Sequence, residues 1–258
     1  MKLGLVLSGG GARGIAHLGI VQALHEADIS FDIISGASAG AIAGAFIAAG
    51  YTPQQVLKFI EDTKVLSTIQ LSFNRRSILR MDRAGKELAK YFPEDSFEAL
   101  KIPLRVSTTD IRKGKTKVYK KKRLIKPILA SCCIPVVFDP VQIGTRHLVD
   151  GGVLDNLPVN SIRKEVDHII GLHCNPIDPG FELSNWKNLL ERTMMMTMTQ
   201  VAYSQRKRCS VFLEPPGLSK YSVFAFNKAR EIYDFGYKYA REEIDKGVLD
   251  VLKYESIK

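Results

Sequence analysis

The sequence predicts an α/β fold, a three-layer α/β/α sandwich with a mainly parallel central sheet. Short apolar runs alternate with longer stretches of helical periodicity, as in folds that bury a parallel sheet between helices. Two of these runs, residues 3–7 and 31–35, end in glycine-framed turns that open helices. The 258 residues are 45% hydrophobic, and no proline- or serine-rich linker interrupts them. We therefore expect a single domain over residues 1–258.

A glycine loop follows the strand predicted for residues 3–7. The loop consists of small residues and one arginine, and its candidate functional members are Gly9, Gly10, Gly11, Arg13 and Gly14. Free backbone amides in such a loop can point at a carbonyl oxygen that becomes an oxyanion during nucleophilic attack. We assign Arg13 to holding the loop rather than to chemistry.

The same glycines also fit a dinucleotide-binding enzyme. Gly9, Gly11 and Gly14 match the G-x-G-x-x-G fingerprint, which requires an acid at the end of the next strand to hold a ribose. Asp32 stands at the beginning of the strand 31–35 instead. The dinucleotide interpretation is therefore the weaker alternative.

The second turn has the pattern of a nucleophile elbow. Ser38 stands where a strand stops and a helix over residues 39–49 starts, and Gly36 and Gly40 flank it. Glycines at these positions let strand and helix pack closely around a sharp turn that exposes the hydroxyl. The amide of Ala39 is a further candidate oxyanion donor.

A serine nucleophile needs a base, and the sequence favours an aspartate. Asp150 lies at the end of a predicted strand and precedes Gly151 and Gly152, which permit an immediate sharp turn. The alternative is an Asx turn in which Asp150 caps its own backbone. The five histidines lack a turn or glycine frame that would aim them at the serine; they are His17, His25, His147, His168 and His173.

These motifs resemble the patatin-like phospholipases over about residues 3–175. The glycine loop, the elbow and the Asp-Gly-Gly turn occur in the family's order, and residues 130–135 resemble a fourth family block, with helices and a strand over 184–250 completing the domain. Ala37 departs from the threonine of many members. The resemblance implies a Ser-Asp dyad with Ser38 as nucleophile and Asp150 as proton acceptor, and an oxyanion hole at Gly9–Gly11. It implies no histidine, metal or organic cofactor.

The expected function is hydrolysis of a lipid acyl ester, of the phospholipase A or lysophospholipase type, through an acyl-enzyme on Ser38. The alternative is a non-catalytic lipid- or membrane-binding protein on the same scaffold. An ordinary aspartate, with a pKa of about 3.9, is a poor base for a hydroxyl. We therefore expect partial burial to raise the pKa of Asp150.

The net charge of +10 is unevenly distributed. Nine basic residues and no acidic residue occur between Arg112 and Lys126. This segment is either a patch that docks on anionic membrane lipid or a solvated hairpin around residues 113–115. Nucleic acid is not expected as a partner, because no recognition fold or interleaved aromatic residues accompany the charges.

The remaining features suggest a cytoplasmic protein, with peripheral membrane contact as an option. The apolar stretch after Lys2 is too short for a signal peptide or a membrane span. Cys132, Cys133, Cys174 and Cys209 have neither metal-site nor disulfide spacing and are expected to be reduced thiols.

Two helices are predicted near the end of the chain. One covers residues 186–201 and is expected to pack its broad apolar face on the core, with an acyl-chain groove or a membrane surface as the alternative for its methionines. The other covers about residues 227–246 and is expected to pack on the sheet.

Overall fold

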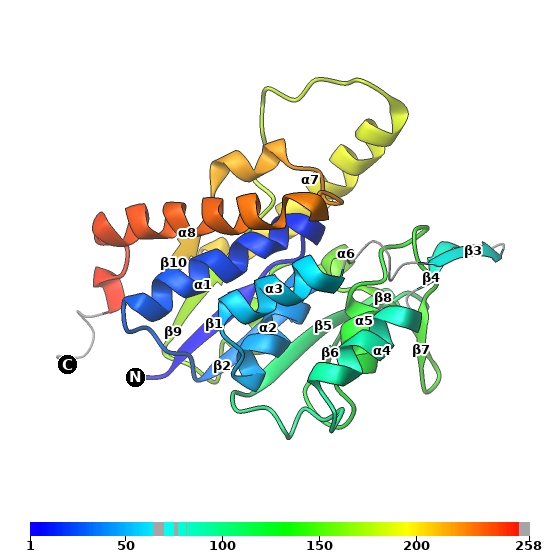
Figure 1. The fold of residues 1–258 in the computed structure, drawn as a ribbon, viewed down its shortest axis with the longest axis horizontal. Coiled ribbons are helices and arrows are strands. Elements are labelled where there is room, and N and C mark those ends of the chain that lie inside the picture. Colours follow the sequence, from blue (N-terminus) through cyan, green and yellow to red (C-terminus); the bar gives the residue numbers. More distant parts are fainter. Residues whose placement is uncertain (64–69, 75–76, 81, 253–258) are drawn as a thin grey trace.

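An eight-stranded sheet forms the centre of the computed structural model, which describes residues 1–63, 70–74, 77–80 and 82–252 (Figure 1). Its strand order is β10-β9-β1-β2-β5-β8-β7, and β6 pairs with β5. The strands are β1 (Leu3–Leu7), β2 (Ile33–Ala37), β5 (Leu104–Asp110), β6 (Lys115–Tyr119), β7 (Val141–Ile143), β8 (Arg146–Asp150), β9 (His168–Leu172) and β10 (Val211–Leu213). A separate hairpin pairs β3 (Gln70–Asn74) with β4 (Ser77–Arg80).

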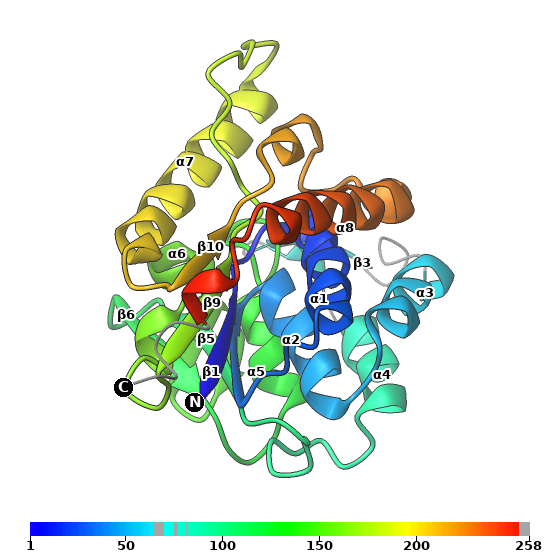
Figure 2. The same ribbon diagram turned by 90° about the vertical axis from the view of Figure 1, so that its left-hand side faces the viewer.

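Helices cover both faces of this sheet, so the predicted α/β fold is confirmed (Figure 2). The helices are α1 (Ala16–Glu26), α2 (Ala39–Ala49), α3 (Pro53–Thr63), α4 (Asp82–Tyr91), α5 (Ile125–Ser131), α6 (Gly152–Asp155), α7 (Trp186–Arg206) and α8 (Ala229–Asp245). Short 3₁₀ helices are η1 (Gly11–Ile15), η3 (Val159–Ser161), η4 (Pro216–Lys220), η5 (Phe226–Lys228) and η6 (Asp250–Leu252). The larger apolar core lies on the face of α1, α2 and α8, and a smaller cluster around Val6, Ile33 and Leu157 lies on the other face.

The sheet is parallel over one part and antiparallel over the other. Strands β10, β9, β1, β2 and β5 run parallel, whereas β6 and β8 run antiparallel to β5. The neighbouring parallel strands β1 and β9 are mainly apolar and buried along their whole length, as expected for strands covered on both faces. Strand β8 runs back along β5, so its carboxyl end lies near the carboxyl end of β2.

The pairing along β5 places β2 and β8 end to end. Ala37, the last residue of β2, pairs with Ser107, and Asp150, the last residue of β8, pairs with the adjacent Thr108. Because β6 occupies the opposite side of β5, β2 and β8 share one side and approach from opposite directions. The residues that leave these two strand ends therefore meet.

Strand β2 differs from its predicted boundaries. We expected residues 31–35, whereas the strand covers Ile33–Ala37. The amide and carboxylate of Asp32 bond instead to the backbone of Leu3, outside the ladder. The strand consequently continues through Gly36 and leads directly into Ser38.

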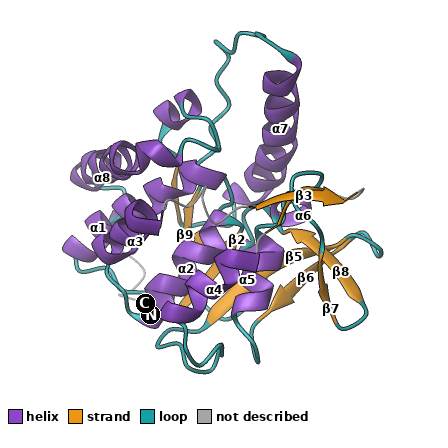
Figure 3. Ribbon diagram, turned by 45° about the vertical axis from the view of Figure 1, so that its right-hand side comes forward, coloured by secondary structure: helices purple, strands orange, loops and turns teal. Residues whose placement is uncertain are grey.

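Helix α7 is longer than predicted, and its first half does not pack on the core. Trp186, Leu189 and Leu190 are 70%, 48% and 52% exposed, whereas Met198, further along the helix, is buried. The prediction of core packing is therefore wrong for the start of α7. The reason is geometric, because this part of the helix projects away from the sheet (Figure 2, Figure 3).

The basic segment forms the hairpin that was one of its two predicted structures. A turn over residues 111–114 joins β5 to β6, and its side chains are exposed. Arg112 and Lys113 lie in the turn, Lys115 and Lys117 lie in β6, and the other five basic residues follow the end of β6. The basic residues are thus distributed along the hairpin and the segment after it.

Candidate active site

Ser38 occupies a strained turn between β2 and α2. Its backbone has φ 51° and ψ −123°, a region that non-glycine residues rarely adopt. A Cβ on Gly36 would collide with the backbone of Gly40, and one on Gly40 would collide with the carbonyl of Leu7. Both flanking glycines are therefore required for the close strand and helix packing that exposes a nucleophile elbow.

The side chain of Ser38 is hydrogen-bonded to Asp150. The hydroxyl Oγ donates to carboxylate Oδ2 at 2.7 Å, and the other carboxylate oxygen accepts from the amide of Gly152 at 2.7 Å. Ser38 is 6% exposed and Asp150 only 2%. Burial raises the pKa of Asp150 from 3.8 to about 6, against the opposing effect of the two hydrogen bonds. The raised pKa agrees with the expectation from sequence, although the burial is nearly complete rather than partial.

None of the histidines is hydrogen-bonded to Ser38 within the described chain. His17 is fully buried with Nε2 bonded to the carbonyl of Ser8, and burial lowers its pKa to about 4. His168 bonds to Ser210 and His173 bonds to Glu214. His25 lies near the end of α1, and His147 lies within β8. Asp150 is thus the carboxylate in contact with the serine hydroxyl.

The candidate oxyanion donors need one correction. The amide of Gly9 donates to Oδ1 of Asn156 at 3.1 Å and also faces its carbonyl, so Gly9 is not a free donor. The amides of Gly10, Gly11 and Ala39 have no acceptor in the part of the chain that the structure describes. Ala39 is also the first residue of α2, where the helix dipole favours negative charge.

Arg13 supports the glycine loop from outside the reaction centre. Its Nε donates to the carbonyl of Tyr221 at 2.6 Å, and its guanidinium lies 4.0 Å from Glu191. The side chain is therefore engaged with the segment around residue 221 and with α7, as an anchor for the loop rather than an oxyanion donor.

The segment 131–133 contacts both Ser38 and Asp150, and the contacts of Ser131 were not predicted. Its hydroxyl donates to the carbonyl of Ser107 at 2.6 Å and accepts from the amide of Ser38 at 2.8 Å. The carbonyl of Cys133 accepts from the amide of Asp150 at 2.9 Å. The segment 131–133 therefore holds both members of the pair. The fourth motif contained this serine, but its partners lie far away in sequence.

Two buried asparagines hold Gly9 from opposite sides, and neither was predicted from the sequence. Asn156 accepts from the amide of Gly9, and Nδ2 of Asn175 donates to its carbonyl at 2.6 Å. Both asparagines are at most 1% exposed. They fix the start of the glycine loop beside Ser38.

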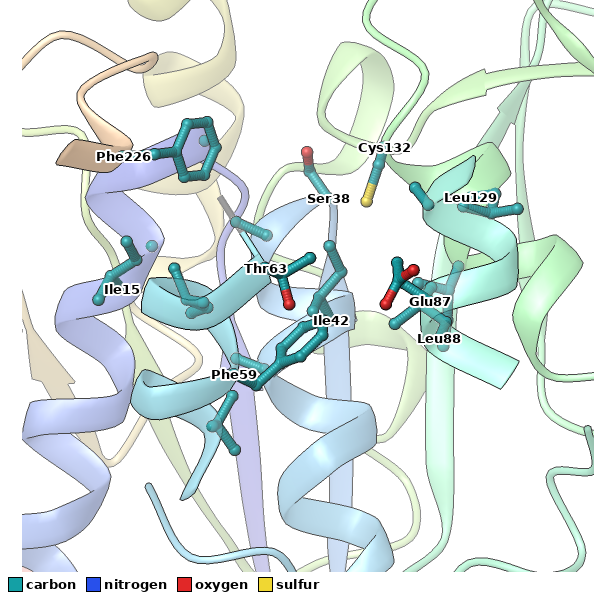
Figure 4. A pocket seen from close by; sticks show the side chains of 18 of the residues that line it. Ile15, Ser38, Ile42, Phe59, Thr63, Glu87, Leu88, Leu129, Cys132 and Phe226 are labelled. Carbon is teal, nitrogen blue, oxygen red and sulfur yellow. The ribbon is translucent and has the colours of Figure 1, made fainter. Parts of the chain in front are cut away.

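An apolar cavity opens at Ser38. It encloses about 1160 Å³ with its open mouth included, and α2, α3, α4, α5 and the segment 223–226 form its walls. Figure 4 shows Ser38 and Cys132 at one end of the cavity, with Ile42, Phe59 and Leu88 deeper inside. Such a cavity suits a long apolar group attached to the carbon that the serine would attack.

The described residues contain no group of three His, Cys, Asp or Glu side chains that could hold a metal ion. The four cysteines form no disulfide with one another, and burial raises the thiol pKa of each, in the case of Cys174 to about 12. No helix among the described residues is both long and apolar enough to cross a membrane.

Curated proteins resemble this chain in sequence over part of their length. Lysophospholipase NTE1 of Candida albicans is 31% identical over 92% of this chain, which corresponds to 20% of the fungal protein. An uncharacterized NTE family protein of Mycobacterium bovis is 34% identical over 62% of this chain and 45% of its own length. The chain thus spans less than half the length of either relative.

The crystal structure of VipD from Legionella pneumophila has a similar fold, with a TM-score of 0.54 and 15% sequence identity, over 95% of this chain and 67% of that chain. The family model "Patatin-like phospholipase" matches residues 5–162. That match covers more than half of the sequence, and the protein accordingly belongs to the patatin-like phospholipase family.

Proposed function

We propose that this protein hydrolyses an acyl ester of a lipid through a dyad of Ser38 and Asp150. The single observation that carries the proposal is the 2.7 Å hydrogen bond from the serine hydroxyl to the buried carboxylate. A carboxylate whose pKa is raised to about 6 remains ionised at neutral pH, yet it is a stronger base than an exposed aspartate. The name of the fungal relative supports a phospholipid or lysophospholipid as substrate.

Acylation begins with proton transfer from Ser38 to Asp150. As Oγ bonds to the ester carbonyl carbon, Oδ2 takes the hydroxyl proton and the carbonyl oxygen becomes an oxyanion. The amides of Gly10, Gly11 and Ala39 are the candidate donors to this oxygen. Collapse of the intermediate breaks the bond to the alcohol, which leaves with the proton held by Asp150.

Deacylation repeats the sequence with water. The water gives a proton to Asp150 as its oxygen bonds to the acyl carbon. Collapse then breaks the bond to Oγ, which recovers the proton from Asp150, and the fatty acid leaves. The reaction needs no histidine, metal or organic cofactor.

The cavity supports a fatty acyl group as the part of the substrate that is recognised. Its lining is mostly aliphatic and aromatic, and Ser38 lies at its end. An acyl chain seated there would gain free energy by leaving water, while the polar headgroup would remain at the open mouth.

The proposal is tested by fatty-acid release from lysophosphatidylcholine and from a soluble short-chain ester. Wild-type protein should release acid, whereas Ser38→Ala and Asp150→Asn proteins with native circular dichroism should not. The Ser35→Ala protein is the matched control, because Ser35 lies in β2 and its hydroxyl contacts Ser161, remote from the dyad. Equal release by all four proteins would contradict the proposal.

A further inference from the structure

The outer side of α7 carries an apolar face that the rest of the described chain leaves open. Its members are 46–70% exposed and are Leu183, just before the helix, with Trp186, Leu189, Leu190 and Met196. At about 100° per residue, the four helical members lie within a stripe of about 120°. The start of α7 projects beyond the body of the molecule (Figure 3). The helical spacing places the four side chains on one side of α7. We call this surface the α7 face.

The opposite side of α7 is attached to the active site. Glu191 accepts from the amide of Val223 at 3.1 Å, and Val223 both lines the catalytic cavity and accepts from the amide of Ala12 at 2.8 Å. Met198 packs against Gly152, next to Asp150. Any surface that binds the α7 face is thereby held in a fixed relation to the cavity mouth.

A third link runs to the glycine loop. The hydroxyl of Thr199 donates to the backbone carbonyl of Asn175 at 2.9 Å. The side-chain amide of Asn175 in turn donates to the carbonyl of Gly9. The helix is therefore connected to both turns that form the site, while its outer side has no function in the chemistry proposed above.

Charge indicates what covers the α7 face. Residues 182–208 contain two acidic residues, Glu182 and Glu191, and five basic residues: Lys187 and Arg192 near Trp186, and Arg206, Lys207 and Arg208 at the other end of the helix. The whole chain carries +10. An amphipathic helix with an apolar stripe, a tryptophan and a basic excess is typical of a segment that lies in the headgroup region of anionic membranes.

We propose that the α7 face docks on a bilayer that contains anionic lipid and holds the mouth of the catalytic cavity at the lipid surface. The proposal rests on lipid hydrolysis as the function, since docking supplies substrate to the same cavity. Phe224, which lines the mouth and is 43% exposed, extends the apolar surface toward the site. An acyl chain can then leave the bilayer for the cavity without crossing water.

Vesicles of ether-linked phosphatidylcholine and phosphatidylglycerol test docking separately from catalysis, because ether lipids contain no ester to hydrolyse. Trp186 is the only tryptophan, so its emission reports the α7 face directly. We expect a blue shift with mixed vesicles and cosedimentation with them. The double substitution Leu189→Gln and Leu190→Gln should weaken binding about tenfold or more, because two apolar side chains no longer enter the interface.

The matched control is Val251→Gln, which changes an exposed apolar residue in η6 and should leave vesicle binding unchanged. The double α7 variant should keep the wild-type rate on a soluble short-chain ester and lose activity on ester-linked vesicles. An unchanged Trp186 emission, or wild-type binding by the double variant, would overturn the proposal. So would a wild-type dimer that the double variant converts to a monomer, since a second copy would then cover the face.

The two proposals fail in different ways. Protein that hydrolyses the soluble ester but does not bind vesicles through α7 retains the proposed function and excludes docking. Protein that binds vesicles through α7 but releases no acid from any ester retains docking and excludes the proposed function. Binding lost in Lys113→Glu and Lys115→Glu protein, but kept in the α7 variant, would assign docking to the β5–β6 turn instead.

Discussion

The hydroxyl of Ser38 and the carboxylate of Asp150 meet at 2.7 Å although 112 residues separate them in the sequence. The cause is the pairing along β5, where Ala37 and Asp150 face the consecutive residues Ser107 and Thr108. Two strands that approach from opposite directions thus bring the serine hydroxyl and the carboxylate together. The same arrangement buries the carboxylate and sets its pKa.

The pH dependence of hydrolysis should report Asp150. The base must be ionised, so kcat/KM should be constant above a pH of about 6 and fall as the pH drops through that value, by about tenfold per unit. The acid limb should be unchanged in His25→Gln and His147→Gln proteins. An acid limb that moves or vanishes in either histidine variant would contradict the dyad.

Removing the charge of Asp150 should stabilise the fold at neutral pH. The pKa of Asp150 is about 6 in the folded protein and near the ordinary value of 3.8 in the unfolded chain. The folded state therefore binds the proton more tightly than the unfolded chain does. Ionisation of Asp150 consequently lowers the free energy of unfolding as the pH rises from 4 toward 7. Asp150→Asn should therefore raise the free energy of unfolding at pH 8 by up to about 3 kcal/mol.

Guanidinium denaturation at two pH values measures this effect. The difference between wild-type and Asp150→Asn proteins should be largest at pH 8 and should nearly vanish below pH 4. Asp245→Asn, on the exposed end of α8, is the control and should change stability little at either pH. If the Asp150→Asn protein has a lower free energy of unfolding than wild type at pH 8, then burial of the ionised carboxylate does not destabilise the fold.

Ser131→Ala should lower kcat more than it changes KM. Without the hydroxyl, the amide of Ser38 loses its acceptor and the strained turn is less well held, which should cost about tenfold to a hundredfold in kcat. Ser35→Ala is the control, since it removes another fully buried hydroxyl that does not touch the elbow. Equal kcat values in the two variants would exclude a positioning role for Ser131.

Ile42→Phe should shorten the acyl chains that the protein accepts. Ile42 lines the cavity (Figure 4), and a larger side chain there fills space that a long chain would need. Rates on short acyl esters should persist while rates on long acyl esters fall. Ile244→Phe, in α8 and outside the cavity, should keep the wild-type preference. An unchanged chain-length profile in Ile42→Phe would place the acyl group elsewhere.

Gly36→Ala should destabilise the protein by roughly 3 kcal/mol or more, because the new methyl group would collide with the backbone of Gly40. Gly114→Ala is the comparison, since Gly114 has φ +58° but no atom within 4 Å of the added Cβ, and it should cost only about 1 kcal/mol of backbone strain. Thermal unfolding of both variants measures the difference. Similar melting temperatures would contradict the tight packing of the elbow.

Local sequence patterns were sufficient for the elements that present the dyad. The strand Leu3–Leu7, the helix Ala39–Ala49 and the position of Asp150 at a strand end follow from apolar runs and glycine turns, which are properties of neighbouring residues. The approach of Asp150 to Ser38 was available only through the resemblance to a family. Periodicity does not reveal that β8 runs antiparallel to β5.

Contacts between distant segments explain what could not be predicted. The sequence predicts Gly9 as an oxyanion donor, but its amide donates a hydrogen bond to Asn156, which is far away in the sequence. The pattern of α7 indicated an apolar face without indicating whether protein covers it. Whether a helix face is buried depends on where the helix lies relative to the sheet. The helical periodicity of a sequence does not give that position.

Covalent labelling by a fluorophosphonate, mapped by mass spectrometry, tests the dyad most directly. The reagent reacts only with an activated nucleophile, so we expect one adduct, on Ser38, in wild-type protein at pH 8. Labelling should be absent in Ser38→Ala and much slower in Asp150→Asn, while Ser35→Ala labels at the wild-type rate. An adduct on another residue, or equal labelling rates with and without the carboxylate of Asp150, would contradict the account.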